Sequence, residues 1–121
     1  MQFASARIIT DDVDRSVAFY ERLLGTSPER LAPVFAAFRG PTGTLAIGHT
    51  TTVPVAGFAA AHDGCLVEFQ AGSPAEVDAT HERVGSWAEV AMPPADMPWG
   101  NRSLLLRDPD GVLVNVYAPL H

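Results

Sequence analysis

Hydrophobic positions recur along the chain with two periods, and these periods predict strands and helices in the same order twice. Residues 2–10 alternate and are rich in β-compatible side chains, so they predict a strand. A helix is expected next, because four apolar residues recur on one helical face. These residues are Val13, Val17, Tyr20 and Leu24.

Short β-like runs follow this helix, which Asp11 or Asp12 can cap at its start and Gly25 can end in a left-handed conformation. The Gly-Pro-Thr-Gly sequence at 40–43 separates the first two runs, and Pro54 makes the third run either an edge strand or a loop. The three runs are 31–38, 44–49 and 52–58.

The second half of the chain repeats this order. Residues 65–70 predict a strand, and the Ser-Pro-Ala-Glu sequence at 73–76 predicts a capped helix that ends at Gly85. The proline-rich stretch 93–99 is expected to be a loop. The remaining β-like runs are 87–92, 102–107 and 112–117. We therefore predict an α+β fold, a single domain over 1–121, built from two βαβββ modules at about 1–60 and about 61–121.

Composition narrows the class of protein. The 121 residues include 8 basic and 14 acidic side chains, which give a net charge of −6. A chain of this charge lacks the basic surface that binds nucleic acid or anionic membranes. A single cysteine excludes an intrachain disulfide scaffold. No signal-peptide or membrane-spanning segment is evident, so a cytoplasmic location is expected.

Two motifs resemble the vicinal oxygen chelate superfamily, which includes glyoxalase I, bleomycin-resistance proteins and extradiol dioxygenases. The first motif runs from Asp12 through Phe19-Tyr20 to Leu24-Gly25, and the second runs from Pro98-Trp99-Gly100 through the turn at 108–111 to Tyr117. The resemblance implies that the two modules form open barrels that hold a small molecule, paired in a homodimer. Because this fold supports several reactions as well as drug sequestration, it does not by itself assign an activity.

The resemblance also implies four positions at which metal-dependent members carry ligands. In this chain they correspond to Ser5, to Gly48 or His49, to Leu66 and to Asn115. Only His49 among them is a metal-ligating side chain, so we expect no metal site and no cofactor. A variant divalent-metal site around His49 and Glu68 is the alternative. His62, His81 and His121 are not expected to be ligands.

Strand alternation places Ser5 and Arg7 on one face of the first strand, and Asn115 and Tyr117 on one face of the last strand. We expect these faces to line a pocket for a small organic molecule, uncharged or zwitterionic. The predicted ligand-binding residues are Ser5, Arg7, His49, Glu68, Trp99, Asn115 and Tyr117.

Three functions remain open at this point. The first is a small-molecule-binding protein without a metal, of the drug-sequestering or bleomycin-resistance type. The second is a glyoxalase-like lyase or isomerase, or a dioxygenase, with a variant metal site or with Glu68 as a metal-free acid or base. The third is a structural dimer with a filled barrel, in which Arg7 and Glu68 form an internal ion pair.

Overall fold

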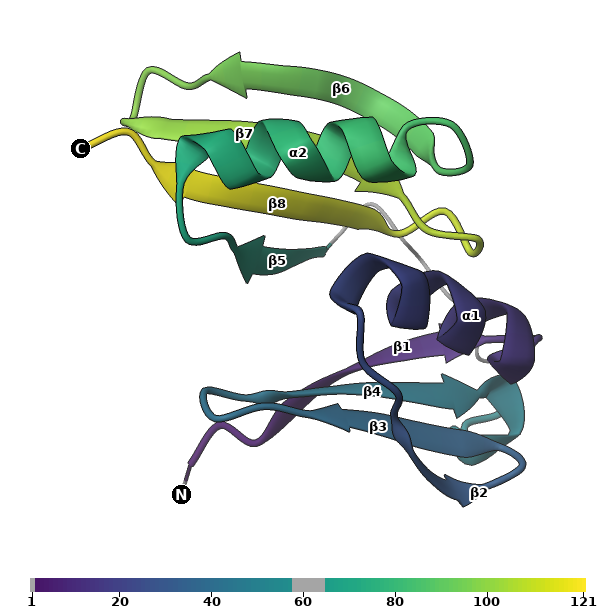
Figure 1. Cartoon of the computed structure of the whole chain (residues 1–121). Helices are drawn as coiled ribbons and strands as arrows, with labels where there is room; N and C mark the ends of the chain where they lie inside the picture. The colour runs from purple at the N-terminus through teal and green to yellow at the C-terminus, as the bar shows by residue number, and fades with distance from the viewer. Residues whose placement is uncertain (1, 58–64) are drawn as a thin grey trace. The chain divides into compact units, whose positions relative to one another are not determined.

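The chain consists of two units with the same order of elements, seen in a computed structural model that describes residues 2–57 and 65–121 (Figure 1). The units are Met1–Ala61 and His62–His121. The first contains β1 (Ser5–Thr10), α1 (Val13–Leu24), β2 (Glu29–Ala32), β3 (Phe35–Arg39), β4 (Thr44–His49) and a 3₁₀ turn, η1 (Thr50–Thr52). The second contains β5 (Leu66–Gln70), α2 (Pro74–Val84), β6 (Glu89–Asp96), β7 (Asn101–Arg107) and β8 (Leu113–Pro119).

The first unit is a sheet of order β1-β4-β3-β2, with β1 parallel to β4 and the other neighbours antiparallel. Helix α1 lies along one face of this sheet (Figure 1). The buried residues of that face alternate along β1 as Ile8 and Thr10, as expected for a strand with one covered face. Ile47 and Tyr20 are fully buried in this core, and the Tyr20 and Phe38 rings lie 6.4 Å apart.

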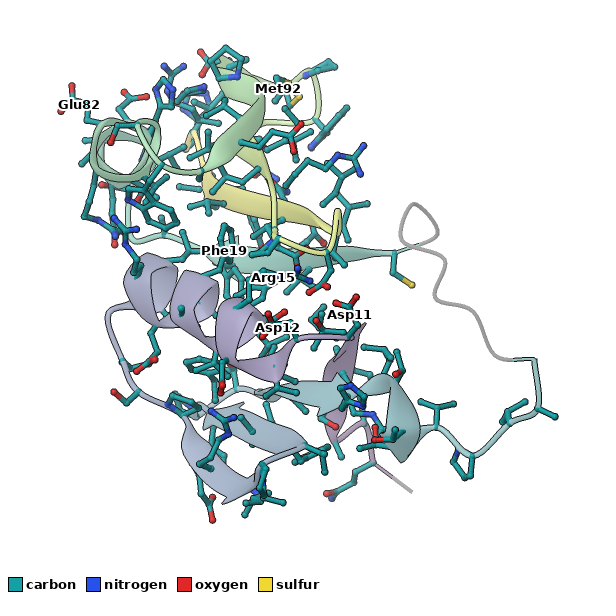
Figure 2. The ribbon with its side chains drawn as sticks, turned by 90° about the vertical axis from the view of Figure 1, so that its right-hand side faces the viewer. Asp11, Asp12, Arg15, Phe19, Glu82 and Met92 are labelled. Atoms are coloured by element: carbon teal, nitrogen blue, oxygen red, sulfur yellow. The ribbon has the colours of Figure 1, made fainter. Side chains whose placement is uncertain are left out.

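Helix α1 has the ends that its sequence predicts. The Asp12 carboxylate accepts a hydrogen bond from the Arg15 amide at 3.1 Å, and Gly25 ends the helix at φ 72°. Asp11, Asp12 and Arg15 lie together at the start of the helix (Figure 2), where Arg15 Nη2 is 2.9 Å from Asp11 Oδ1. Arg30 of β2 forms an ion pair with Asp14 at 2.6 Å and ties the outer strand to the helix.

The second unit has the matching sheet order β5-β8-β7-β6, and α2 lies across one face of it (Figure 1). Val77 and Val84 of α2 are fully buried, as are Leu104, Leu106 and Val114 of the sheet. Glu82 projects from α2 on the side away from the sheet (Figure 2) and is exposed.

Arg102 of β7 links the helix to the outer strand of the same unit. Its Nε lies 2.8 Å from Asp78 Oδ1 on α2, and its Nη1 lies 2.9 Å from Asp96 Oδ1 on β6. The hydrogen bond to Asp78, followed by the one to Asp96, raises the pKa of the Arg102 guanidinium above its ordinary value.

The predicted α+β fold with two βαβββ units is confirmed, but one expected loop is a strand. Residues 93–96, expected in a loop because of their prolines, continue β6 to Asp96. Strand β6 is the outermost strand of its sheet and pairs on one side only, so it tolerates proline better than a central strand does. Register shifts between Val90 and Ala95 absorb the irregularity.

One further detail differs from the sequence expectation, and one open alternative is resolved. The run 31–38 divides into β2 and β3, which pair as a hairpin. The run 52–58 forms no strand over its described part: Thr52 is the last residue of η1, and residues 53–57 follow as irregular chain and a turn. Pro54 lies within it, in agreement with the loop alternative. Phe58 and His62 lie outside the described residues, and within the described ones no helix is long and apolar enough to cross a membrane.

Candidate functional site

Each sheet has one face that its helix does not cover, and six of the seven predicted site residues lie on these faces or beside them. In the second unit the uncovered face can be traced by strand register. Glu68 on β5 lies opposite Asn115 on β8, Asn115 lies opposite Leu105 on β7, and Leu105 lies opposite Met92 on β6. This row crosses the whole sheet, with its polar pair at one end and its apolar residues at the other.

Glu68 and Asn115 form a direct polar pair. Asn115 Nδ2 donates to Glu68 Oε2 at 2.9 Å across the parallel strands. The other side-chain atom of Asn115, Oδ1, is buried and accepts no hydrogen bond from the described residues. Because a buried acceptor without a donor costs about 1–3 kcal/mol, this unsatisfied oxygen is an unfavourable feature of the protein as described.

Tyr117 lies on the same face of β8 as Asn115, one row further along, between Gln70 and Ser103. Trp99 lies in the tight turn between β6 and β7, closed by a hydrogen bond from the Gly100 amide to the Met97 carbonyl at 3.0 Å. Its side chain is 71% exposed, so it is not packed beneath the proline-rich segment. An exposed tryptophan at a turn is available for contact with an apolar molecule.

In the first unit, Ser5 and Arg7 lie on the uncovered face of β1, opposite Thr44 and Ala46 of β4. Both are exposed, whereas the next residue, Ile8, is buried beneath α1. The Arg7 guanidinium lies 5.8 Å from the centre of the Phe35 ring, a cation–π distance.

His49 lies on the other face of the first sheet. Its register partner is Thr10, on the helix-covered face, whereas Gly48 pairs with Ile9 on the face that carries Arg7. His49 Nδ1 accepts a hydrogen bond from the Thr51 amide at 3.1 Å and lies 2.8 Å from Thr51 Oγ1. The side chain therefore caps the 3₁₀ turn, and its Nδ1 lone pair is in use.

The residues at the family's metal positions do not fit a divalent metal ion. Ser5 offers an unionised hydroxyl, Gly48 offers no side chain, Leu66 is an alkyl group, and Asn115 offers a neutral amide already bonded to Glu68. Among the described residues, no three His, Cys, Asp or Glu side chains are grouped so that they could hold a metal.

Strand register identifies site residues that periodicity alone missed. Leu105 and Met92 extend the Glu68–Asn115 row, and Phe35 lies beneath the Arg7 guanidinium. Alternation shows which residues of one strand share a face, but not which residue on the next strand lies opposite. The signal present in the sequence is Phe35 itself, an aromatic residue at the start of a predicted β-run.

Comparison with known proteins identifies the family. The profile of the glyoxalase/bleomycin resistance protein/dioxygenase superfamily matches residues 2–116. A crystal structure of a glyoxalase/bleomycin resistance protein/dioxygenase from Nocardioides is 30% identical, with a TM-score of 0.80, and the match covers 100% of this chain and 85% of that one. A glyoxalase/bleomycin resistance protein from Albidiferax ferrireducens is 27% identical, with a TM-score of 0.75 and coverage of 96% and 98%.

A lactoylglutathione lyase from Agrobacterium tumefaciens shares the fold at 23% identity and a TM-score of 0.76, with coverage of 97% and 92%. No curated protein matches the sequence. The resemblance carried by the helix and turn motifs is thus confirmed over nearly the whole length. The chain belongs to the glyoxalase/bleomycin resistance protein/dioxygenase superfamily.

Proposed function

We propose that this protein binds a small, mostly apolar organic molecule at the uncovered sheet faces, without a metal ion. The observation that supports this most directly is the buried Asn115 Oδ1, which has no donor within the described residues. Leu105 and Met92 continue its row across the sheet, so a ligand that donates one hydrogen bond here can lay an apolar body beside it. Trp99 and Tyr117 are the other proposed contacts in the second unit, and Ser5 and Arg7 are the proposed contacts on the uncovered face of the first unit.

We propose that the protein sequesters a drug-like or metabolite-like molecule. The superfamily's name includes bleomycin resistance proteins, and this proposal follows that part of the name. A polar pair at the edge of an apolar surface is sufficient for recognition and requires no reacting group. A cytoplasmic homodimer is part of the same proposal, supported by the superfamily to which the chain belongs.

The test is a ligand screen by thermal unfolding. A molecule that binds only the native state raises the melting temperature. At a concentration of 100 times Kd, it adds about 2.7 kcal/mol to the free energy of unfolding. We expect hits among aromatic natural products and metabolites that carry an O–H or N–H donor, with the shift reduced in Asn115→Leu. If no compound from such a collection raises the melting temperature, the proposal is wrong.

A second candidate function is metal-free proton transfer by Glu68, as in a lyase or isomerase. Glu68 is exposed, and its one hydrogen bond to the described residues comes from Asn115, which holds the carboxylate without covering it. Such a carboxylate can remove a proton from carbon beside a carbonyl group and return it to the product. Proton transfer by Glu68 can be distinguished from sequestration by experiment, because only the former converts a substrate to a product.

The distinguishing variant is Glu68→Gln, which keeps the shape of the side chain and an oxygen that can accept from Asn115. If Glu68 is the acid or base, this variant loses turnover and keeps ligand affinity. Lactoylglutathione, the compound in the name of the Agrobacterium relative, is a first substrate to assay. Equal rates in wild type and Glu68→Gln would exclude this role for Glu68.

A further inference from the structure

Arg7 is held flat across the uncovered face of the first sheet. Its aliphatic stem passes over Gly48, where an added Cβ would lie 3.0 Å from Arg7 Cδ and 3.5 Å from Cγ. The same Cβ would lie 2.9 Å from Thr52 Oγ1, whose hydroxyl donates to the His49 carbonyl at 2.7 Å. The guanidinium then reaches the Phe35 ring, 5.8 Å away. Gly48 provides the space and Phe35 provides the surface that fix this side chain.

The charge of Arg7 has no protein partner among the residues that the structure describes. A second arginine on the same face, Arg39, is neutralised by Glu29, with Arg39 Nε 2.8 Å from Glu29 Oε2. Arg15 and Arg30 also have carboxylate partners. The sequence has 14 acidic residues and 8 basic ones, so carboxylates are in excess. Arg7 is exposed and positioned by its neighbours, and it is bonded to no carboxylate of the described residues, so it is open to a carboxylate from outside.

We infer that Arg7 binds the carboxylate of a small organic monoanion. The planar guanidinium fork matches a carboxylate in a two-point hydrogen-bonded pair. The cross-strand neighbour Ala46 and the strand neighbour Ile9 are apolar, so no second cation lies beside Arg7 on these strands to balance a dianion. They and Phe35 favour an apolar body next to the charged group. This inference rests on the proposed function, because it names the charge class of the ligand, and it replaces the uncharged or zwitterionic molecule that the sequence suggested.

The experiment compares matched pairs of probes: phenylacetate and 3-phenylpropionate, each against its neutral primary amide. Affinities are measured by calorimetry, and the Nε–H signal of Arg7, assigned by its loss in Arg7→Met, is followed by NMR. We expect the carboxylates to bind about ten-fold more tightly than the amides, because a charge-assisted hydrogen bond is stronger than a neutral one and part of this gain is lost at an exposed position. The Arg7 signal should move with the carboxylates and not with the amides.

Arg7→Met should abolish this preference, and Arg39→Met is its matched control. Both variants remove one positive charge from the same sheet face, but Arg39 already has Glu29 as its partner. A preference that persists in Arg7→Met, or one that Arg39→Met reduces equally, overturns the inference. Thermal unfolding of each variant verifies that it is folded.

Two further variants test the positioning of the guanidinium without removing it. Gly48→Ala places a methyl group against the Arg7 stem, and Phe35→Leu removes the ring but keeps an apolar side chain. Each should reduce the carboxylate preference several-fold, and unchanged preference in both overturns the inference. If amides bind as tightly as carboxylates, or neither series binds, the inference is wrong. The proposed function is wrong only if the ligand screen by thermal unfolding also finds no ligand.

Discussion

Asn115 donates its side-chain amide to the Glu68 carboxylate across the parallel strands β8 and β5, with 2.9 Å between Nδ2 and Oε2. The two residues are direct register partners, so the pair is fixed by the sheet and not by a flexible loop. The orientation of the amide leaves Asn115 Oδ1 buried, with no donor from the described residues. A buried acceptor without a donor costs stability, and the proposed function assigns this oxygen to a ligand's O–H or N–H group.

Replacement of Asn115 by leucine should separate stability from binding. Asn115→Leu removes the unsatisfied oxygen and adds apolar surface beside Leu105, its partner on β7. We expect the free energy of unfolding to stay the same or to increase by about 1 kcal/mol, because loss of a buried unpaired group is favourable. Urea unfolding measures this, and ligand affinity should fall in the same variant. A loss of stability above about 2 kcal/mol would show that the amide is structural.

Asp108 should be essential for the turn between β7 and β8. Its carboxylate oxygen Oδ1 accepts from the amides of Asp110 and Val112, both at 2.9 Å, and the residue is buried. Asp108→Ala leaves the buried Val112 amide without this acceptor, so we expect a loss of about 1–3 kcal/mol in urea unfolding. Asp108→Asn keeps a carbonyl acceptor at the same place and should recover a large part of the loss. Equal losses in the two variants would contradict this explanation.

The two helix-ending glycines should respond to alanine for different reasons. Gly25 has φ 72°, and an added Cβ would meet no atom within 4 Å, so Gly25→Ala costs about 1 kcal/mol from backbone strain alone. Gly85 has φ −64°, but an added Cβ would lie 2.7 Å from the His81 carbonyl oxygen. Asparagine, which tolerates the left-handed region, should partly restore stability at Gly25 and not at Gly85. Thermal unfolding of the four variants tests this contrast.

Local signals allowed most of the fold to be predicted from the sequence. The cap at Asp12 and the stop at Gly25 act within a few residues, so α1 was correctly bounded. The prolines of residues 93–96 led to a wrong prediction of a loop. Whether a proline interrupts a strand depends on whether that strand lies at a sheet edge. That information is a property of the whole sheet and not of the segment.

The candidate site was less predictable, because it depends on register between strands. Alternation placed Ser5 with Arg7, and Asn115 with Tyr117, on common faces. It could not show that His49 pairs with Thr10 on the covered side, a displacement of one residue that reverses the direction of the side chain. The hydrogen bond between Glu68 and Asn115 joins residues 47 positions apart, and no local pattern indicates it.

The chemistry of the donor set leads to a last prediction, on metal binding. Ser5, Leu66 and Asn115 replace charged or imidazole ligands with a hydroxyl, an alkyl group and an amide, so divalent ions should bind weakly. Protein purified without chelators or a metal-binding tag, then dialysed against Mn²⁺, Fe²⁺, Ni²⁺ and Zn²⁺ in turn, should retain no stoichiometric ion on elemental analysis. The matched variants are His49→Ala and Glu68→Gln, which should leave the metal content unchanged. A stoichiometric ion lost in either variant would establish a variant metal centre and redirect the search for substrates toward metal-assisted chemistry.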